Sequence, residues 1–180
     1  TALVRGNTAY GNASAGIRTS GSVTVQGNTA YANATGIAGG GPILNNTVRN
    51  NTVQGILVQS NGGRILNNTI YQPLGVGIAV QSSLNVDIRN NIIVVESGPA
   101  YSIASDGQAG FGADYNIVHT TPGASYVATW GASQFLTLGD WSNTLGFDAH
   151  SLNAAPLFID SGGGNLHLQN SSPAIDAGDP

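Results

Sequence analysis

Short apolar stretches recur along the chain at a steady spacing, and polar turn residues separate them. The unit is clearest in three β-prone runs, 64–66, 69–71 and 76–81, which are parted by an Asn-Asn corner at 67–68 and a loop at 72–75. Each run is too short for a helix, is rich in Ile, Val and Thr, and is bounded by Gly, Asn, Ser or Pro. The pattern therefore predicts three short strands and three corners per unit.

Two sequence marks repeat with this unit. An asparagine precedes one strand at steps of 21, 18, 22, 23 and 25 residues, by subtraction of neighbouring positions: Asn7, Asn28, Asn46, Asn68, Asn91 and Asn116. The second mark is Gly16-Ile17, Gly36-Ile37, Gly55-Ile56 and Gly77-Ile78, then Ser102-Ile103. Two marks that drift together predict a solenoid whose coil of about 18 to 25 residues is stacked at least five times.

Side-chain alternation along each strand predicts which residues point into the solenoid. The isoleucines of the second mark form one inward column. The residues three before each ladder asparagine form another: Val4, Val25, Ile43, Ile65, Ile88 and Ala113. Those two after it form the third: Ala9, Ala30, Val48, Ile70, Ile93 and Val118. We expect the asparagine itself to take the left-handed conformation of the corner and its amide to bond to its counterpart in the next coil.

This succession of strand, Asn-Asn corner, strand, loop and Gly-Ile strand resembles the right-handed parallel β-helix of the pectate-lyase-like superfamily. The resemblance covers roughly residues 1–120. Residues 121–180 belong to the same domain as C-terminal coils and a capping segment. They are similar to a segment of bacterial secreted β-helix proteins with a G-x-D-x-H-S turn (residues 146–151) and an S-P-A-I-D-A-G run (residues 172–178). The expected fold is an all-β, three-sheet solenoid with a less regular C-terminal cap.

The repeat fails after Asn116, and the following stretch carries both tryptophans. The end of a solenoid exposes unpaired backbone groups and an apolar cross-section, so we expect this tail to add coils and a lid with a short helix near Leu138 to Thr144. Asp148 and His150, at alternating positions, would share one face of a strand. They are weak candidates for a metal or acid–base pair, but they lack a third ligand, and capping hydrogen bonds are the competing interpretation.

Composition excludes several classes of function. Only 8% of residues are charged, the net charge is −4 and lysine is absent, so the chain lacks the basic footprint of a nucleic-acid-binding protein. No apolar run is long enough to span a bilayer. The absence of cysteine excludes disulfides and thiolate chemistry. No cofactor is indicated, although Asp160, Asp176 and Asp179 would supply calcium ligands if the fold brought them together.

Candidate contact residues lie on two outward faces. On the sheet of the Gly-Ile strands, where polysaccharide-active β-helices usually carry their groove, one column reads Arg18, Ala38, Leu57, Ala79 and Ala104, and the next includes Gln59, Gln81 and Asp106. No lysine or carboxylate pair suited to a lyase or a hydrolase appears there. On another sheet, Tyr10, Tyr31, Arg49, Tyr71, Val94 and His119 form a column that would offer aromatic rings and a guanidinium to sugars. The alternative is that the tyrosines only cover the sheet.

These observations favour a non-catalytic, secreted or surface-exposed bacterial β-helix that serves as a scaffold or contacts a polysaccharide. Because the chain starts at Thr1 in mid-repeat, we expect it to be processed or part of a larger secreted protein. One alternative is a polysaccharide lyase, hydrolase or epimerase, or a fragment of one. Another is a self-associating structural element that extends end to end.

Overall fold

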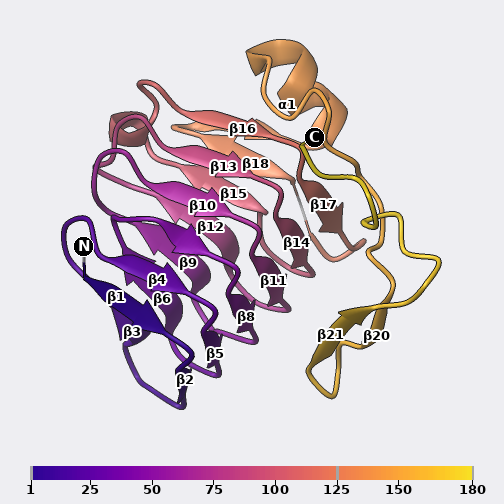
Figure 1. The fold of residues 1–180 in the computed structure, drawn as a ribbon. Helices are drawn as coiled ribbons and strands as arrows, with labels where there is room; N and C mark the ends of the chain where they lie inside the picture. The colour runs from indigo at the N-terminus through magenta and orange to yellow at the C-terminus, as the bar shows by residue number, and fades with distance from the viewer. Residues whose placement is uncertain (1, 125, 180) are drawn as a thin grey trace.

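A computed structural model describes residues 2–124 and 126–179, and it confirms the predicted fold class (Figure 1). The chain winds as a parallel solenoid whose coils each contribute one strand to each of three sheets. Thr1, where we expected a start in mid-repeat, lies outside the described residues.

The three sheets run along the solenoid axis. Sheet A contains β1 (Leu3–Arg5), β4 (Thr24–Gln26), β7 (Ile43–Leu44), β10 (Arg64–Leu66), β13 (Asp87–Arg89) and β16 (Gly112–Asp114). Sheet B contains β2 (Thr8–Tyr10), β5 (Thr29–Tyr31), β8 (Thr47–Arg49), β11 (Thr69–Gln72), β14 (Ile92–Val95) and β17 (Ile117–Thr120). Sheet C contains β3 (Ala15–Arg18), β6 (Thr35–Gly39), β9 (Gln54–Val58), β12 (Val76–Val80), β15 (Tyr101–Ile103) and β18 (Ala128–Trp130), and it ends with the antiparallel β19 (Ser133–Phe135).

The core is a column of aliphatic side chains inside the three sheets. Two of its rows are those that alternation predicts, with Val25, Ile43, Ile65 and Ile88 from sheet A and Ala30, Val48, Ile70 and Ile93 from sheet B, all fully buried. Strand register stacks each member directly on its equivalent in the next coil, for example Ile65 on Ile88 and Ile70 on Ile93. Burial of these apolar side chains supplies the main driving force for winding.

The six asparagines of the first mark form a continuous ladder at the corner between sheets A and B. In each step, the backbone N–H and the Nδ2 of one asparagine donate to Oδ1 of the next, at 2.9 and 3.0 Å between Asn28 and Asn46. The expectation that the asparagine itself is left-handed is wrong. The residue before it takes that conformation: Gly6, Gly27, Asn45, Asn67, Asn90 and Tyr115. This leaves the ladder side chain free to turn inward, where its amide satisfies buried backbone carbonyls.

A second ladder, which the sequence pattern did not reveal to us, stands at the corner between sheets B and C. Asn12, Asn33 and Asn51 are linked in the same way, and Gln72 completes the row by accepting from Asn51 and donating to its carbonyl. In three coils the sequence does carry a sign of this ladder, because an asparagine stands five residues after the asparagine of the first ladder. In the next coil the ladder residue is Gln72, which lies at the end of β11 and reaches the same position with its longer side chain.

The second sequence mark is misaligned in its last member. Ile78 pairs with Tyr101, and Ile103 pairs with Val80, so Ser102-Ile103 is two residues out of register with the Gly-Ile strands. Tyr101 replaces isoleucine in the inward column and is fully buried. A bulky ring at this level begins the aromatic cap of the solenoid.

The cap is built from α1 (Leu138–Leu145) and a cluster of aromatic side chains. Thr137 and Asp140 form a capping box at the start of the helix, and Gly146 ends it in the left-handed conformation with φ 78°. Trp141 is fully buried. Its ring centre lies 6.0 Å from that of Tyr101, in a stacked arrangement, and 6.2 Å from that of Phe111, in an edge-to-face arrangement. The predicted helix and its covering position are therefore present at the end of the coils.

The rest of the tail differs from the expected C-terminal coils. Strand β18 adds to sheet C, but β20 (Phe158–Asp160) and β21 (Asn165–Leu168) pair with each other as an antiparallel hairpin. This hairpin lies beside sheet B, away from α1 (yellow in Figure 1). A short 3-10 helix, η1 (Ser105–Gly107), follows β15. Within the described residues, no helix has the length and apolar character that crossing a membrane requires.

Candidate functional site

The outward face of sheet C carries little polar chemistry. Its central column runs from Arg18 through Ala38, Leu57 and Ala79 to Ser102, not Ala104, because of the register at β15. Ala38, Leu57 and Ala79 form a small apolar cluster. Arg18 is thus the one charged side chain in this column of the described strands, and no carboxylate lies beside it there.

The polar row predicted beside this column is broken. Gln59 and Gln81 are exposed, whereas Asp106 lies in η1 and turns back to accept from the backbone N–H and the hydroxyl of Ser82 at 2.9 and 2.8 Å. These bonds, the backbone one foremost, lower the pKa of the Asp106 carboxyl. The structure thus places Asp106 in a loop contact and not in line with the glutamines.

The column of tyrosines and arginine does stand on the outward face of sheet B. Strand register aligns Tyr10, Tyr31, Arg49, Tyr71, Val94 and His119 one above another. The rings of Tyr10 and Tyr31 are parallel at 5.1 Å, and the Arg49 guanidinium lies 4.2 Å from the centre of the Tyr31 ring. Both faces of the Tyr31 ring are thus occupied, so only its edge is free for a ligand.

The tail covers the middle of this column. Tyr71 is buried, and its hydroxyl donates to Glu96 Oε1 at 2.6 Å. Burial, followed by this bond to Glu96, raises the pKa of Tyr71, while an interaction with Ser161 in the hairpin turn acts in the opposite direction. Tyr71 is therefore buried and bonded to Glu96, and the predicted sugar-stacking role is not open to it in this arrangement.

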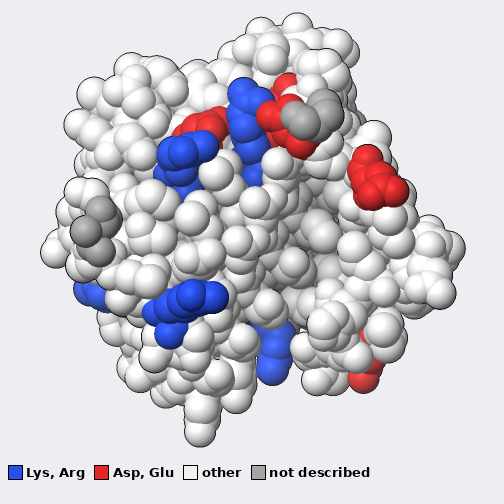
Figure 2. All heavy atoms as spheres, in the orientation of Figure 1, with Lys and Arg blue, Asp and Glu red and all other residues white. Residues whose placement is uncertain are grey.

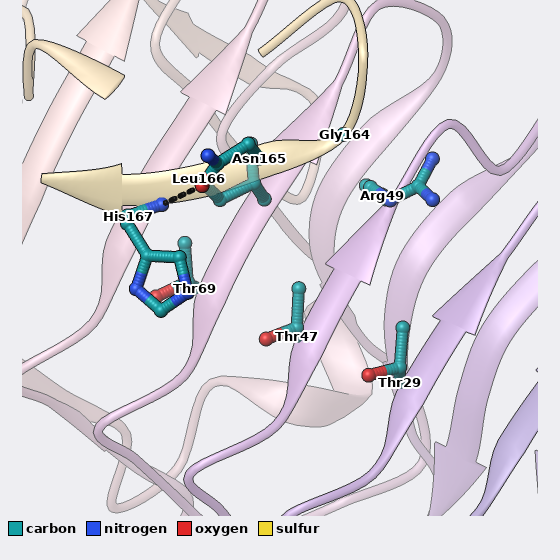
Figure 3. Close-up of a pocket in the computed structure, with 8 residues that line it drawn as sticks. All are labelled: Thr29, Thr47, Arg49, Thr69, Gly164, Asn165, Leu166 and His167. Atoms are coloured by element: carbon teal, nitrogen blue, oxygen red, sulfur yellow. Dashed lines mark hydrogen bonds between the residues drawn. The ribbon is translucent and has the colours of Figure 1, made fainter. Parts of the chain in front are cut away.

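A hollow of about 450 Å³ opens between sheet B and the hairpin (Figure 3). Its floor is a row of threonines, Thr29, Thr47 and Thr69, which occupy equivalent positions on β5, β8 and β11. Asn165 and His167 of β21 face them from the opposite wall, and Arg49 closes one end. Sequence reasoning singled out Arg49 alone among these residues, because nothing in the repeat shows where a distant hairpin comes to lie.

Arg49 is held where the hairpin touches the coils. A Cβ atom at Gly164 would lie 2.6 Å from Cζ of Arg49, and Gly164 has φ +85°, so glycine permits the close approach. No carboxylate lines the hollow, so its charged lining is basic. Figure 2 shows few charged side chains on this side of the molecule, with positive and negative groups in contact near the top of the view, and a surface that is hollowed between the coils and the tail.

The pair Asp148 and His150 does not share one face. Both lie in a turn and not in a strand, since Asp148 has φ 54°. Asp148 is buried and ends the first ladder, accepting from Asn116 Nδ2 at 3.0 Å, Ser151 Oγ at 2.6 Å and Trp141 Nε1 at 2.9 Å. Burial raises the pKa of the Asp148 carboxyl against these bonds.

His150 turns outward to a different carboxylate. Its Nδ1 lies 2.8 Å from Asp114 Oδ2, and its ring stacks on Tyr115 at 4.9 Å. Burial of Asp114 opposes ionisation, but hydrogen bonds from the side chain and backbone of His150 and from the backbone of Tyr115 outweigh it and lower the pKa of Asp114. The two residues therefore serve two separate contacts, as the capping alternative predicts.

The acidic residues of the tail are also dispersed. Asp160 accepts from Gly163 N within its own turn, and Asp179 pairs with Arg89. In the part of the chain that the structure describes, no three His, Cys, Asp or Glu side chains gather as metal ligands would.

The three-sheet parallel winding and the asparagine ladders define a parallel β-helix. Residues 39–138, more than half of the chain, match the family described as the right-handed β-helix region, and the chain belongs to this family. Searches among curated proteins and solved structures found no significant match.

Proposed function

We propose that this protein is a carbohydrate-contacting β-helix module, which holds a segment of a polysaccharide in the hollow between sheet B and the C-terminal hairpin. The observation that carries the proposal is the threonine row, whose three hydroxyls face Asn165 and His167 across an open, polar hollow. Hydroxyl, amide, imidazole and guanidinium groups are the donors and acceptors that sugar hydroxyls require.

The spacing of the row favours an extended ligand. Neighbouring strands of a sheet lie about 4.8 Å apart, so the three threonines repeat the same polar group along the solenoid axis. A polymer with regularly placed hydroxyls meets such a row repeatedly, whereas a small ligand uses one step of it. We therefore favour a chain-like carbohydrate over a small metabolite.

The sequence resemblance supports the setting of this proposal. The tail motifs are similar to those of bacterial secreted β-helix proteins, and the coils resemble the pectate-lyase-like superfamily. We infer a secreted or surface-exposed bacterial protein that contacts polysaccharide without acting on it, since the hollow is not lined by a carboxylate pair.

The test is a pair of threonine variants measured against a panel of neutral and uronate-containing polysaccharides. Thr47 lies at the centre of the row, and Thr24 lies on sheet A with a similarly half-buried side chain. Thr47→Val removes one hydroxyl without changing shape and should weaken binding about 2- to 10-fold. Thr24→Val should leave binding unchanged. Absence of binding by the unmodified protein across the panel, or equal losses in both variants, would refute the proposal.

A further inference from the structure

A second hollow, of about 340 Å³, lies beneath the end of the tail. Its sheet side presents Ile92 of β14 and Ile117 of β17. Its outer side is formed by the segment that contains Ala174 and Ala177. Tyr115, Asp179 and three asparagines, Asn67, Asn90 and Asn91, also line it. The recess therefore combines an aliphatic patch of two isoleucines and two alanines with amide, phenol and carboxylate groups.

This hollow continues the first one along the same column of sheet B. Ile92 is paired with Thr69, and Ile117 with Ile92, so the column, which begins at Thr8, reads four threonines and then two isoleucines. The change from hydroxyl to aliphatic side chain falls between β11 and β14, one coil apart. A ligand that lies along the column therefore contacts the threonines first and then the two isoleucines of the second hollow.

Hydrogen bonds, an ion pair and ring stacking hold the residues on both sides of the second hollow in place. Asp179 donates its backbone N–H to Asn90 Oδ1 at 2.8 Å, and its carboxylate lies 3.2 Å from Arg89 Nη1. On the other side, Tyr115 is stacked against His150, which is bonded to Asp114. The recess is therefore a formed part of the structure and does not depend on a ligand to shape it.

We propose that this recess is a subsite for a sugar unit that carries a methyl-terminated substituent, as in a 6-deoxy or an O-acetyl sugar. The inference rests on the proposed carbohydrate-contacting function and specifies its ligand. A polar ring with one small apolar group matches a recess in which an aliphatic patch lies beside amides and a phenol. A bare hydroxyl placed directly against Ile92 and Ile117 would exchange water for an apolar surface, which is unfavourable.

The experiment compares sugars that differ only in this group. The probes are rhamnose- against mannose-containing oligosaccharides, fucose- against galactose-containing ones, and an acetylated polysaccharide against the same preparation after mild deacetylation. We expect the methyl-bearing member to bind about 3- to 10-fold more tightly, because one apolar group in a partly open recess contributes at the low end of such discrimination.

The decisive variant is Ile92→Thr, which continues the threonine row by one coil. The same column already holds threonine in four consecutive strands, so the sheet should accept the change, and an unchanged melting curve checks this. The variant should lose the preference for the methyl-bearing member while it keeps its affinity for the other member. Thr69→Ile is the matched control, and it should weaken both members by the same factor.

The outcomes separate the two proposals. If the unmodified protein binds, is weakened by Thr47→Val and shows no preference in any pair, the recess subsite is wrong and the carbohydrate-contacting function stands. A preference that persists in Ile92→Thr also overturns the subsite. Binding to none of these probes overturns the subsite, and it overturns the carbohydrate-contacting function as well only if the panel of neutral and uronate-containing polysaccharides is also not bound.

Discussion

The buried rung of the first ladder offers the sharpest test of the fold. Asn46 is 1% exposed. Its Oδ1 accepts from the backbone N–H and Nδ2 of Asn28 at 2.9 and 3.0 Å, and its Nδ2 donates to Asn68 Oδ1 at 2.9 Å and to the Val25 carbonyl at 3.0 Å. Asn46→Ala removes four hydrogen bonds from a site that water does not reach.

The expected decrease in the free energy of unfolding depends on which hydrogen-bonding groups the substitution leaves without a partner. Asn28 Nδ2 still donates to two carbonyls, and Asn68 Oδ1 still accepts from the backbone of residue 46. The backbone N–H of Asn28 loses its acceptor, which costs about 1 to 3 kcal/mol. With the lost amide contacts and the small cavity, we expect a decrease of about 2 to 4 kcal/mol in the free energy of unfolding, or about 4 to 16 °C in Tm.

Asn7 is the control at an exposed rung: like Asn46, its Nδ2 donates to the next asparagine and to a backbone carbonyl, but within the described chain no donor reaches its Oδ1. Water can replace what Asn7→Ala removes, so its effect should stay below about 1 kcal/mol. Urea unfolding followed by far-UV circular dichroism measures both variants. Tryptophan fluorescence, which reports the cap, shows whether the transition is cooperative. Equal losses in the two variants, or a loss below about 1 kcal/mol for Asn46→Ala, would refute the view that burial makes the ladder stabilising.

Three further changes test the cap, the hairpin and the acid response. Trp141→Ala empties the centre of the aromatic cap and should lower the free energy of unfolding by about 3 to 5 kcal/mol in urea titration; a loss below about 1 kcal/mol would contradict the packing role. Gly164→Ala should displace the hairpin and speed hydrogen exchange in β20 and β21, whereas Gly162→Ala, whose Cβ would make an ordinary 3.7 Å contact, should not; equal exchange in both would exclude the close approach. Because the pKa of Asp114 is lowered by its bonds to His150, its ionised form stabilises the fold above about pH 4, and this contribution is lost as the pH falls through the folded-state pKa. The difference in Tm between the wild type and Asp114→Asn should therefore shrink between pH 6 and pH 2, and a constant difference would contradict the assignment.

The sequence by itself determined the coils, because each coil repeats one local rule. Alternating apolar residues such as Ile65 and Ile70 must face one core, and an asparagine must recur at each corner between sheets A and B. These requirements act between equivalent residues one coil apart, so periodicity alone reveals them. Periodicity does not say which corner residue is left-handed, and the structure places that conformation on the residue before the asparagine. The error at Ile103 arose where the loop between β14 and β15 departs from the repeat.

Only the tertiary structure decided where the site lies. The hairpin docks on sheet B through contacts that occur once, such as Gly164 against Arg49 and Asp179 against Arg89. Such contacts join residues far apart in the chain and leave no period in the sequence. Thr29, Thr47 and Thr69 fall at equivalent positions of the repeat, but their role as the floor of a hollow depends on the tail that covers them. Asp148 likewise gains its role at the end of the ladder only because the cap folds back onto Asn116.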